Sequence, residues 1–194
     1  MPNIERINVT LRRTGDAMPN IERINVTLRR TGVLYGQNVS FMLSRKSIQK
    51  INGMQKVSAS DTTVTMYVPD LVTITSPKIE KTEDLFPYCY YKEFKLKWNA
   101  DTNNLNGLVV IVEWYGSSLT DNKTNKYIRN IDILPVDNGE AVLNNKLFDN
   151  IPEKAIAYIT LLRGNISVLD NLTDPYRLVA ESHAILPLIL IRNL

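Results

Sequence analysis

The chain has 194 residues, 44% of them hydrophobic and 22% charged, with a formal net charge of +3. This length allows one sizeable domain, or one domain with a small appendage, and the composition is that of an ordinary globular protein. Lysine and arginine are mixed with aspartate and glutamate along the chain, which argues against a nucleic-acid partner. The single cysteine, Cys89, excludes an intrachain disulfide and the metal or redox motifs that need two thiols.

The N-terminus carries a perfect repeat. Residues 1–15, MPNIERINVTLRRTG, recur unchanged as residues 18–32, separated only by Asp16 and Ala17. Two identical short copies do not indicate a solenoid, whose units usually drift in sequence and number three or more. We interpret residues 1–17 as a recent duplication or an artefact. Each copy alternates apolar and polar residues and can form a strand, so we expect the surplus copy to be a tail or an extra edge strand, on its own or a neighbouring molecule.

The alternation continues over residues 33–43, which predicts a further strand. Residues 44–60 are polar and are predicted to form a loop, with one helical turn at 47–51. Strands are predicted again at residues 62–68 and 71–75, each followed by a proline that stops it. Residues 78–86 are charged and irregular, and we expect a connector there.

Residues 93–116 are the most informative stretch. Apolar and charged residues alternate strictly over 94–98, which predicts a strand with one face on a core. Residues 108–114 are almost wholly apolar and rich in β-branched side chains, which predicts a central strand. The polar segment between them ends in Asn106-Gly107, so the two strands either pair as neighbours or turn the corner between two sheets.

Short strands with turn residues between them occupy the rest of the chain. We predict strands at residues 126–134, 141–143, 147–148, 155–162, 166–169 and 178–191. Asp137-Asn138-Gly139, Ile151-Pro152 and Gly164-Asn165 mark turns, and Pro187 interrupts the last strand. No amphipathic pattern of helical length occurs. The spacing is typical of an all-β sandwich.

Several of these strands carry a recognisable pattern. Trp98, the run from Val110 to Trp114, Leu147, the Ile151-Pro152 turn and Tyr158 resemble the B, C, E and F strands of a fibronectin type III or related immunoglobulin-like domain. The resemblance implies an immunoglobulin-like (fibronectin type III-like) β-sandwich over residues 72–194. Residues 18–71 would add N-terminal strands and a hairpin packed on it.

A second resemblance rests on four short segments. They are GQNVSF at 36–41, ITSP at 74–77, LKWNAD at 96–101 and AESH at 180–183. Together they resemble small surface lipoproteins of uncharacterised function from Bacteroidetes-type bacteria. The resemblance implies an exported, extracytoplasmic protein of the cell surface or outer membrane. Its signal and anchoring cysteine would lie upstream of this sequence, because Cys89 is mid-chain.

The residue types offer little catalytic chemistry. His183 is the only histidine and alternates with apolar neighbours, as a structural histidine does. Glu113 interrupts an apolar strand, and burying its carboxylate unpaired would cost several kcal/mol, so we expect it to face outward. The 101–107 loop resembles a calcium loop but has leucine at the fifth position and Val112 at the twelfth, where glutamate is required. We expect no enzyme activity, no cofactor and no metal.

An aromatic group is the candidate binding site. Tyr88, Tyr90 and Tyr91, with Tyr115, could form a platform for a glycan or protein, because tyrosine gives contact area at a small entropy cost. The alternative is that Tyr88 and Tyr90 continue the inward parity of residues 94–98 and pack in the core. Cys89 between them is expected to be an inert packed thiol.

The sequence thus predicts a non-enzymatic, exported binding or interaction module for a glycan or protein at the cell surface. The alternative is a structural subunit of a surface assembly, a homo-oligomer in which an N-terminal strand such as residues 24–28 completes a neighbour's sheet.

Overall fold

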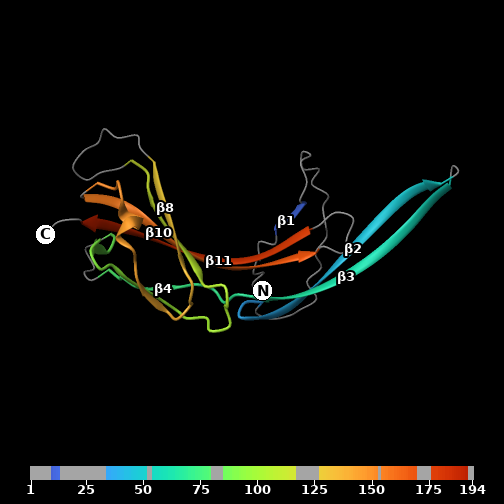
Figure 1. The fold of residues 1–194 in the computed structure, drawn as a ribbon, viewed down its shortest axis with the longest axis horizontal. Coiled ribbons are helices and arrows are strands. Elements are labelled where there is room, and N and C mark those ends of the chain that lie inside the picture. Colours follow the sequence, from blue (N-terminus) through green and yellow to red (C-terminus); the bar gives the residue numbers. More distant parts are fainter. Residues whose placement is uncertain are drawn as a thin grey trace. The chain divides into compact units, whose positions relative to one another are not determined.

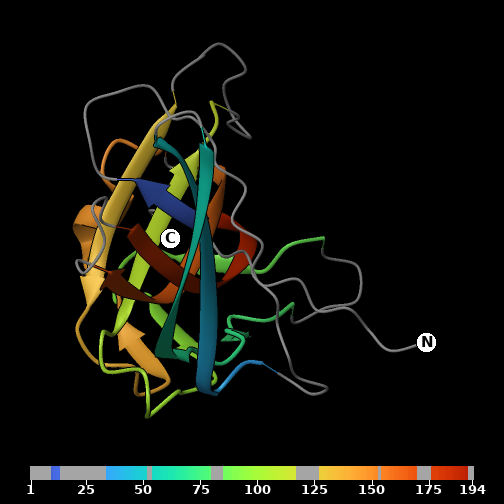
Figure 2. The same ribbon diagram turned by 90° about the vertical axis from the view of Figure 1, so that its right-hand side faces the viewer.

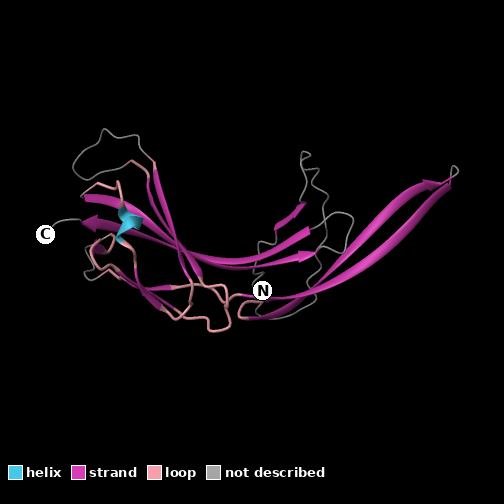
Figure 3. Ribbon diagram, viewed as in Figure 1, coloured by secondary structure: helices cyan, strands magenta, loops and turns pink. Residues whose placement is uncertain are grey.

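The computed structural model describes residues 10–13, 34–51, 54–79, 85–116, 127–152, 154–169 and 176–191. Strands make up most of the described chain, and the one helical segment is a single 3-10 turn, η1 (Asn145–Phe148) (Figure 3). The all-β prediction is therefore confirmed. The chain divides into two compact units, Met1–Val68 with Asn165–Ala180, and Pro69–Gly164 with Glu181–Leu194, which we call unit 1 and unit 2.

Unit 2 contains two sheets. The smaller has the order β4 (Ile74–Ser76), β6 (Lys95–Trp98), β9 (Glu140–Val142). In the larger sheet, β5 (Tyr88–Tyr90) pairs with β11 (Tyr176–Ile191), followed by β10 (Lys154–Leu169), β7 (Leu108–Trp114) and β8 (Ile128–Leu134). Figure 1 shows β10 and β11 as long neighbouring strands, and both belong in part to unit 1.

Both sheets of unit 2 contribute to one hydrophobic core. Leu96 and Trp98 of β6 lie in the same buried cluster as Val110 and Val112 of β7 and Ile159 of β10. These side chains face the core because successive residues of a strand point to opposite faces of the sheet. The residues of β6 are in turn exposed, buried, exposed and buried, and every second residue of β7 is fully buried. The predicted half-buried strand and central strand are confirmed, and of the two arrangements left open for them, the corner between sheets is the one observed.

Unit 1 contains the hairpin of β2 (Gln37–Ile51) and β3 (Met54–Val68). The two strands pair in register along their whole length and form a separate two-stranded sheet, running side by side in Figures 1 and 2. One face of the hairpin near its open end is buried in a second core. The members of this core are Leu34, Val39, Phe41, Val64, Met66, Val68, Leu178 and Ala180.

The N-terminal repeat enters the large sheet through its first copy. Residues Thr10–Arg13 form β1, which pairs antiparallel with Tyr176–Val179 of β11. The second copy, and with it the strand predicted at residues 24–28, lies outside the described residues. One copy of the repeat therefore serves as an edge strand.

Four local predictions were wrong. Residues 44–60 were expected to be a loop with a helical turn, but residues 44–51 continue β2 and residues 54–60 belong to β3. Cross-strand pairing satisfies the backbone of this polar segment, which has no apolar alternation of its own. Leu147 and Phe148 lie on η1 instead of a strand. The expected turn at Gly164-Asn165 is absent, since β10 continues through it. The expected interruption at Pro187 is absent as well, since β11 continues from Tyr176 to Ile191.

Candidate functional site

The large sheet of unit 2 has an apolar outer face, which we define as the side turned away from the core. Two cross-strand rows carry it, each with one residue from β10, β7 and β8. The rows are Thr160–Ile111–Ile131 and Leu162–Val109–Ile133. Ile131 and Ile133 are 57% and 65% exposed. Adjacent apolar side chains left in contact with water on a sheet usually mark an interaction surface.

A tyrosine cluster adjoins these rows. The next row is Tyr158–Glu113–Arg129, and the Tyr115 ring packs against the rings of Tyr127 and Tyr158, with centroids 5.3 and 5.5 Å apart. Tyr115 and Tyr127 remain 59% and 55% exposed. Since aromatic pairs prefer such tilted and edge-on arrangements, the cluster is fixed before any ligand arrives.

Glu113 is the polar centre of the tyrosine cluster. Its carboxylate accepts hydrogen bonds from the hydroxyls of Tyr127 (2.6 Å) and Tyr115 (3.2 Å), and Arg129 Nε lies 3.7 Å away. The hydrogen bond to Glu113 raises the pKa of Tyr127, with desolvation adding to it. For Tyr115, desolvation by the packed rings is the larger cause of the raised pKa, and the charge of Glu113 comes second. Glu113 faces outward as expected, but it is paired.

Tyr88 and Tyr90 are exposed, as the platform hypothesis requires. They are 54% and 44% exposed on β5, while Cys89 between them is buried. The alternative, that both tyrosines pack in the core, was wrong. Glu93 has φ 54°, so the chain turns between β5 and β6 and the parity of residues 94–98 does not carry back. Tyr91 is half-buried and packs against the core.

The four predicted tyrosines do not form one patch. β5 and β7 are separated by β11 and β10, so three strand spacings, about 14 Å, lie between Tyr90 and the strand that leads to Tyr115. Tyr115 instead joins Tyr127 and Tyr158. Sequence reasoning missed both partners, although Tyr158 alternates with the buried Ala157 and Ile159 and could have been assigned to an outer face.

A buried ionic cluster at another place in unit 2 has a structural role. The Arg163 side chain is fully buried, and its Nη2 and Nη1 donate to the carbonyls of Asn99 (2.6 Å) and Asp70 (3.3 Å). Its Nε lies 3.1 Å from Asp137 Oδ2. The guanidinium thereby ties three separate loops of the unit to β10.

Asp137 is the nearer counter-charge of Arg163, and Asp101 Oδ2 lies 4.0 Å from its Nη1. Trp98 Nε1 donates to its Oδ1 (2.7 Å) and Asn104 Nδ2 to its Oδ2 (3.0 Å). Asp101, in the loop that resembles a calcium site, accepts from the backbone N–H groups of Asp70 (2.8 Å) and Asn103 (3.1 Å). These carboxylates are engaged by the protein itself. Within the described residues, no group of three or more histidine, cysteine, aspartate or glutamate side chains is arranged to hold a metal ion.

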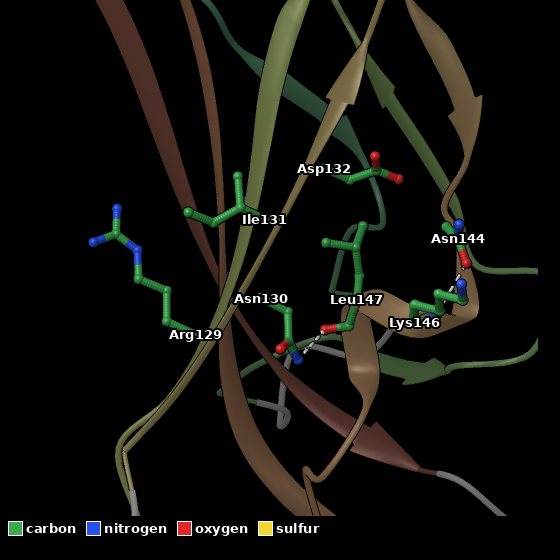
Figure 4. A pocket seen from close by; sticks show the side chains of 7 residues that line it. All are labelled: Arg129, Asn130, Ile131, Asp132, Asn144, Lys146 and Leu147. Carbon is green, nitrogen blue, oxygen red and sulfur yellow. Dashed lines mark hydrogen bonds between the residues drawn. The ribbon is translucent and has the colours of Figure 1, made fainter.

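An open groove runs between β8 and η1. It has a volume of about 400 Å³ and is lined by Arg129, Asn130, Ile131, Asp132, Asn144, Lys146 and Leu147. Figure 4 shows Asn130 and Asp132 on the side of β8 that faces η1, and Arg129 and Ile131 on the other side. Asn130 Nδ2 donates to the carbonyls of Leu147 (2.9 Å) and Asp149 (3.1 Å), and these hydrogen bonds hold the η1 segment against β8.

None of the helical residues described is part of a segment long and apolar enough to cross a bilayer. His183 is exposed on β11. Comparison of the chain with protein-family models, curated proteins and solved structures finds no match.

Proposed function

We propose that this chain is a non-enzymatic interaction module that binds a protein partner through the outer face of its large sheet. The observation that carries the proposal is the tyrosine cluster beside two rows of partly exposed aliphatic side chains. Burying an exposed isoleucine contributes about 1.5–3 kcal/mol, and tyrosines give rigid, amphipathic contact area. Such a surface is suited to association with another protein.

The aliphatic rows favour a protein over a glycan. A sugar ring stacks on an aromatic face but presents hydroxyl groups elsewhere, and those would be left without partners against Ile111, Ile131 and Ile133. A protein can instead place apolar side chains on the rows and a polar rim near Glu113 and Arg129. A glycan ligand therefore remains as an outcome of the binding test below.

We also propose that unit 2 is an immunoglobulin-like, fibronectin type III-like sandwich. Strand order supports this proposal, because β4-β6-β9 corresponds to an A-B-E sheet and β11-β10-β7-β8 to a G-F-C-C′ sheet. Export to the cell surface, the lipid anchor and the lack of catalysis stay predictions. A hydrolase using Glu113 or His183 would be recognised if alanine at these positions abolished a measured activity.

The binding test uses the purified chain on arrays of glycans, mucin and purified surface proteins. The variant Tyr115→Ala/Tyr127→Ala removes the tyrosine cluster, and Tyr88→Ala/Tyr90→Ala is the matched control, with two exposed tyrosines on β5. Protein binding that the first variant loses and the second keeps supports the proposal. Binding only to glycans, or equal binding by both variants, would overturn it.

A further inference from the structure

β8 is the last strand of the large sheet among the described strands, so one of its edges has no neighbouring strand in that sheet. In an antiparallel pair, residues whose N–H and C=O bond the neighbour alternate with residues whose backbone groups point away. The N–H of Ile133 donates to the Asp132 side chain (2.9 Å) and so belongs to the second group. By alternation the backbone groups of Arg129 and Ile131 also point toward this edge.

The side chains along the β8 edge differ on its two faces. Ile131 and Ile133 are exposed on the outer face, whereas Asn130 and Asp132 lie on the groove side (Figure 4). A strand added here would place alternate residues beside isoleucines and the others beside an amide and a carboxylate. The edge therefore suits an extended segment that alternates apolar and polar residues and carries a positive charge on its polar side.

The chain itself carries such a segment twice. Residues 7–13 and 24–30 both read Ile-Asn-Val-Thr-Leu-Arg-Arg, with three apolar residues alternating with asparagine, threonine and arginine. In the first copy, Thr10–Arg13 already adds to a sheet edge as β1. Each molecule thus contains two copies of a sequence that can pair with the edge of a sheet, and part of the first copy pairs with β11.

We infer that the β8 edge binds an extended strand from a second copy of this chain, and that residues 24–30 supply it. The apolar residues of the incoming strand lie beside Ile131 and Ile133, and an arginine pairs with Asp132. This association differs from partner binding by the outer face in using the backbone groups of β8 and none of the clustered tyrosines, while Ile131 and Ile133 contribute to both.

Two complementary variants test the inference by sedimentation velocity. In an antiparallel addition, the residues beside Ile131 and Ile133 are those whose N–H groups face β8. Val26→Pro therefore blocks the strand but keeps the edge, and Ile131→Pro blocks the edge but keeps the strand, removing an N–H that points away from β7. We expect the parent to associate with increasing concentration, each variant alone to be monomeric, and an equimolar mixture to form a heterodimer. Val26→Ile, which keeps the N–H, is the control and should behave as the parent.

A charge variant covers the case in which Ile131→Pro fails to fold. Asp132→Lys places like charges together and is expected to weaken association at least tenfold, while Tyr115→Ala/Tyr127→Ala leaves it unchanged. A parent that stays monomeric at all concentrations, or Val26→Pro and Asp132→Lys variants that associate as the parent does, would overturn the inference.

Discussion

Arg163 holds a positive charge at a position where its side chain has no exposure to solvent. Breaking a buried ion pair by removing one partner costs about 3–5 kcal/mol when the remaining charge is left uncompensated. Asp101 Oδ2 lies 4.0 Å from Arg163 Nη1 and would still offset part of the charge. We therefore expect Asp137→Asn to lower the free energy of unfolding by less than this, about 2–3 kcal/mol. Urea denaturation measures it, with the exposed Asp149→Asn as the control. Equal stability of the two variants would show that Asp137 does not balance Arg163.

The two hydroxyls bound to Glu113 should titrate differently once it is neutralised. Both tyrosines have a pKa above 10.0, but the Glu113 hydrogen bond is the largest cause for Tyr127 and desolvation for Tyr115. Glu113→Gln should therefore lower the pKa of Tyr127 more than that of Tyr115. Ring-carbon chemical shifts followed by NMR through alkaline pH measure both, and equal shifts would contradict the assignment.

The raised pKa values also set the sign of a stability change in that pH range. Because both tyrosines ionise less readily in the folded chain, their contribution to stability is fully present below pH 10.0 and is lost as pH rises through the folded pKa values. The Glu113→Gln variant should lose less stability over this interval. Urea midpoints at neutral and alkaline pH provide the comparison.

At the scale of elements, Gly107 determines how β6 leads into β7. It has φ +67°, and a Cβ there would lie 2.1 Å from the carbonyl oxygen of Leu134. Gly107→Ala therefore combines backbone strain with overpacking, and we expect a loss of about 2–4 kcal/mol. Thermal unfolding measures the loss. Leu105→Ala in the same loop, at an 87% exposed position, should change little, and a similar loss in both variants would argue against the steric cause.

Elements with strong side-chain patterns could be predicted from the sequence, and elements held by pairing alone could not. β6 and β7 carry their burial in their alternation, so their type and faces were correct. The far half of the β2–β3 hairpin has no such pattern, and its strands follow from their register with each other. Which residues of β5 face the core depends on the positive φ of Glu93, and a positive φ at a glutamate cannot be predicted from the sequence.

At the scale of the whole molecule, both tryptophans belong to one unit. Trp98 and Trp114 are buried in the core of unit 2, and none of the hairpin residues whose burial is described belongs to that core. Phe148→Ala in this core should lower the tryptophan-reported unfolding midpoint, at a cost of about 3–5 kcal/mol. Phe41→Ala in the core of unit 1 should leave that midpoint unchanged while reducing hydrogen-exchange protection in β2 and β3. A shift of the midpoint by Phe41→Ala would show that the two cores unfold together.

The candidate site could be predicted only in part, because it is assembled across strands. The sequence identified exposed tyrosines, and Tyr88, Tyr90 and Tyr115 are exposed. It grouped them by closeness along the chain, whereas sheet order separates β5 from β7 and brings Tyr158 beside Glu113. Strand order and register therefore decided which side chains meet.

The apolar outer face also bears on the fidelity of folding. Along β7, Val109 and Ile111 on the outer side are about as hydrophobic as Val110 and Val112 on the inner side, so most of this strand would tolerate being turned over. A slip of one residue exchanges the faces, and only at the end of the strand would it bury the Glu113 carboxylate and bring Trp114 into water. Within β7, Glu113 and Trp114 are therefore the residues that most strongly favour the native register over a register shifted by one residue. We expect a β7 that pairs one residue out of register during folding to be disfavoured mainly at this end of the strand.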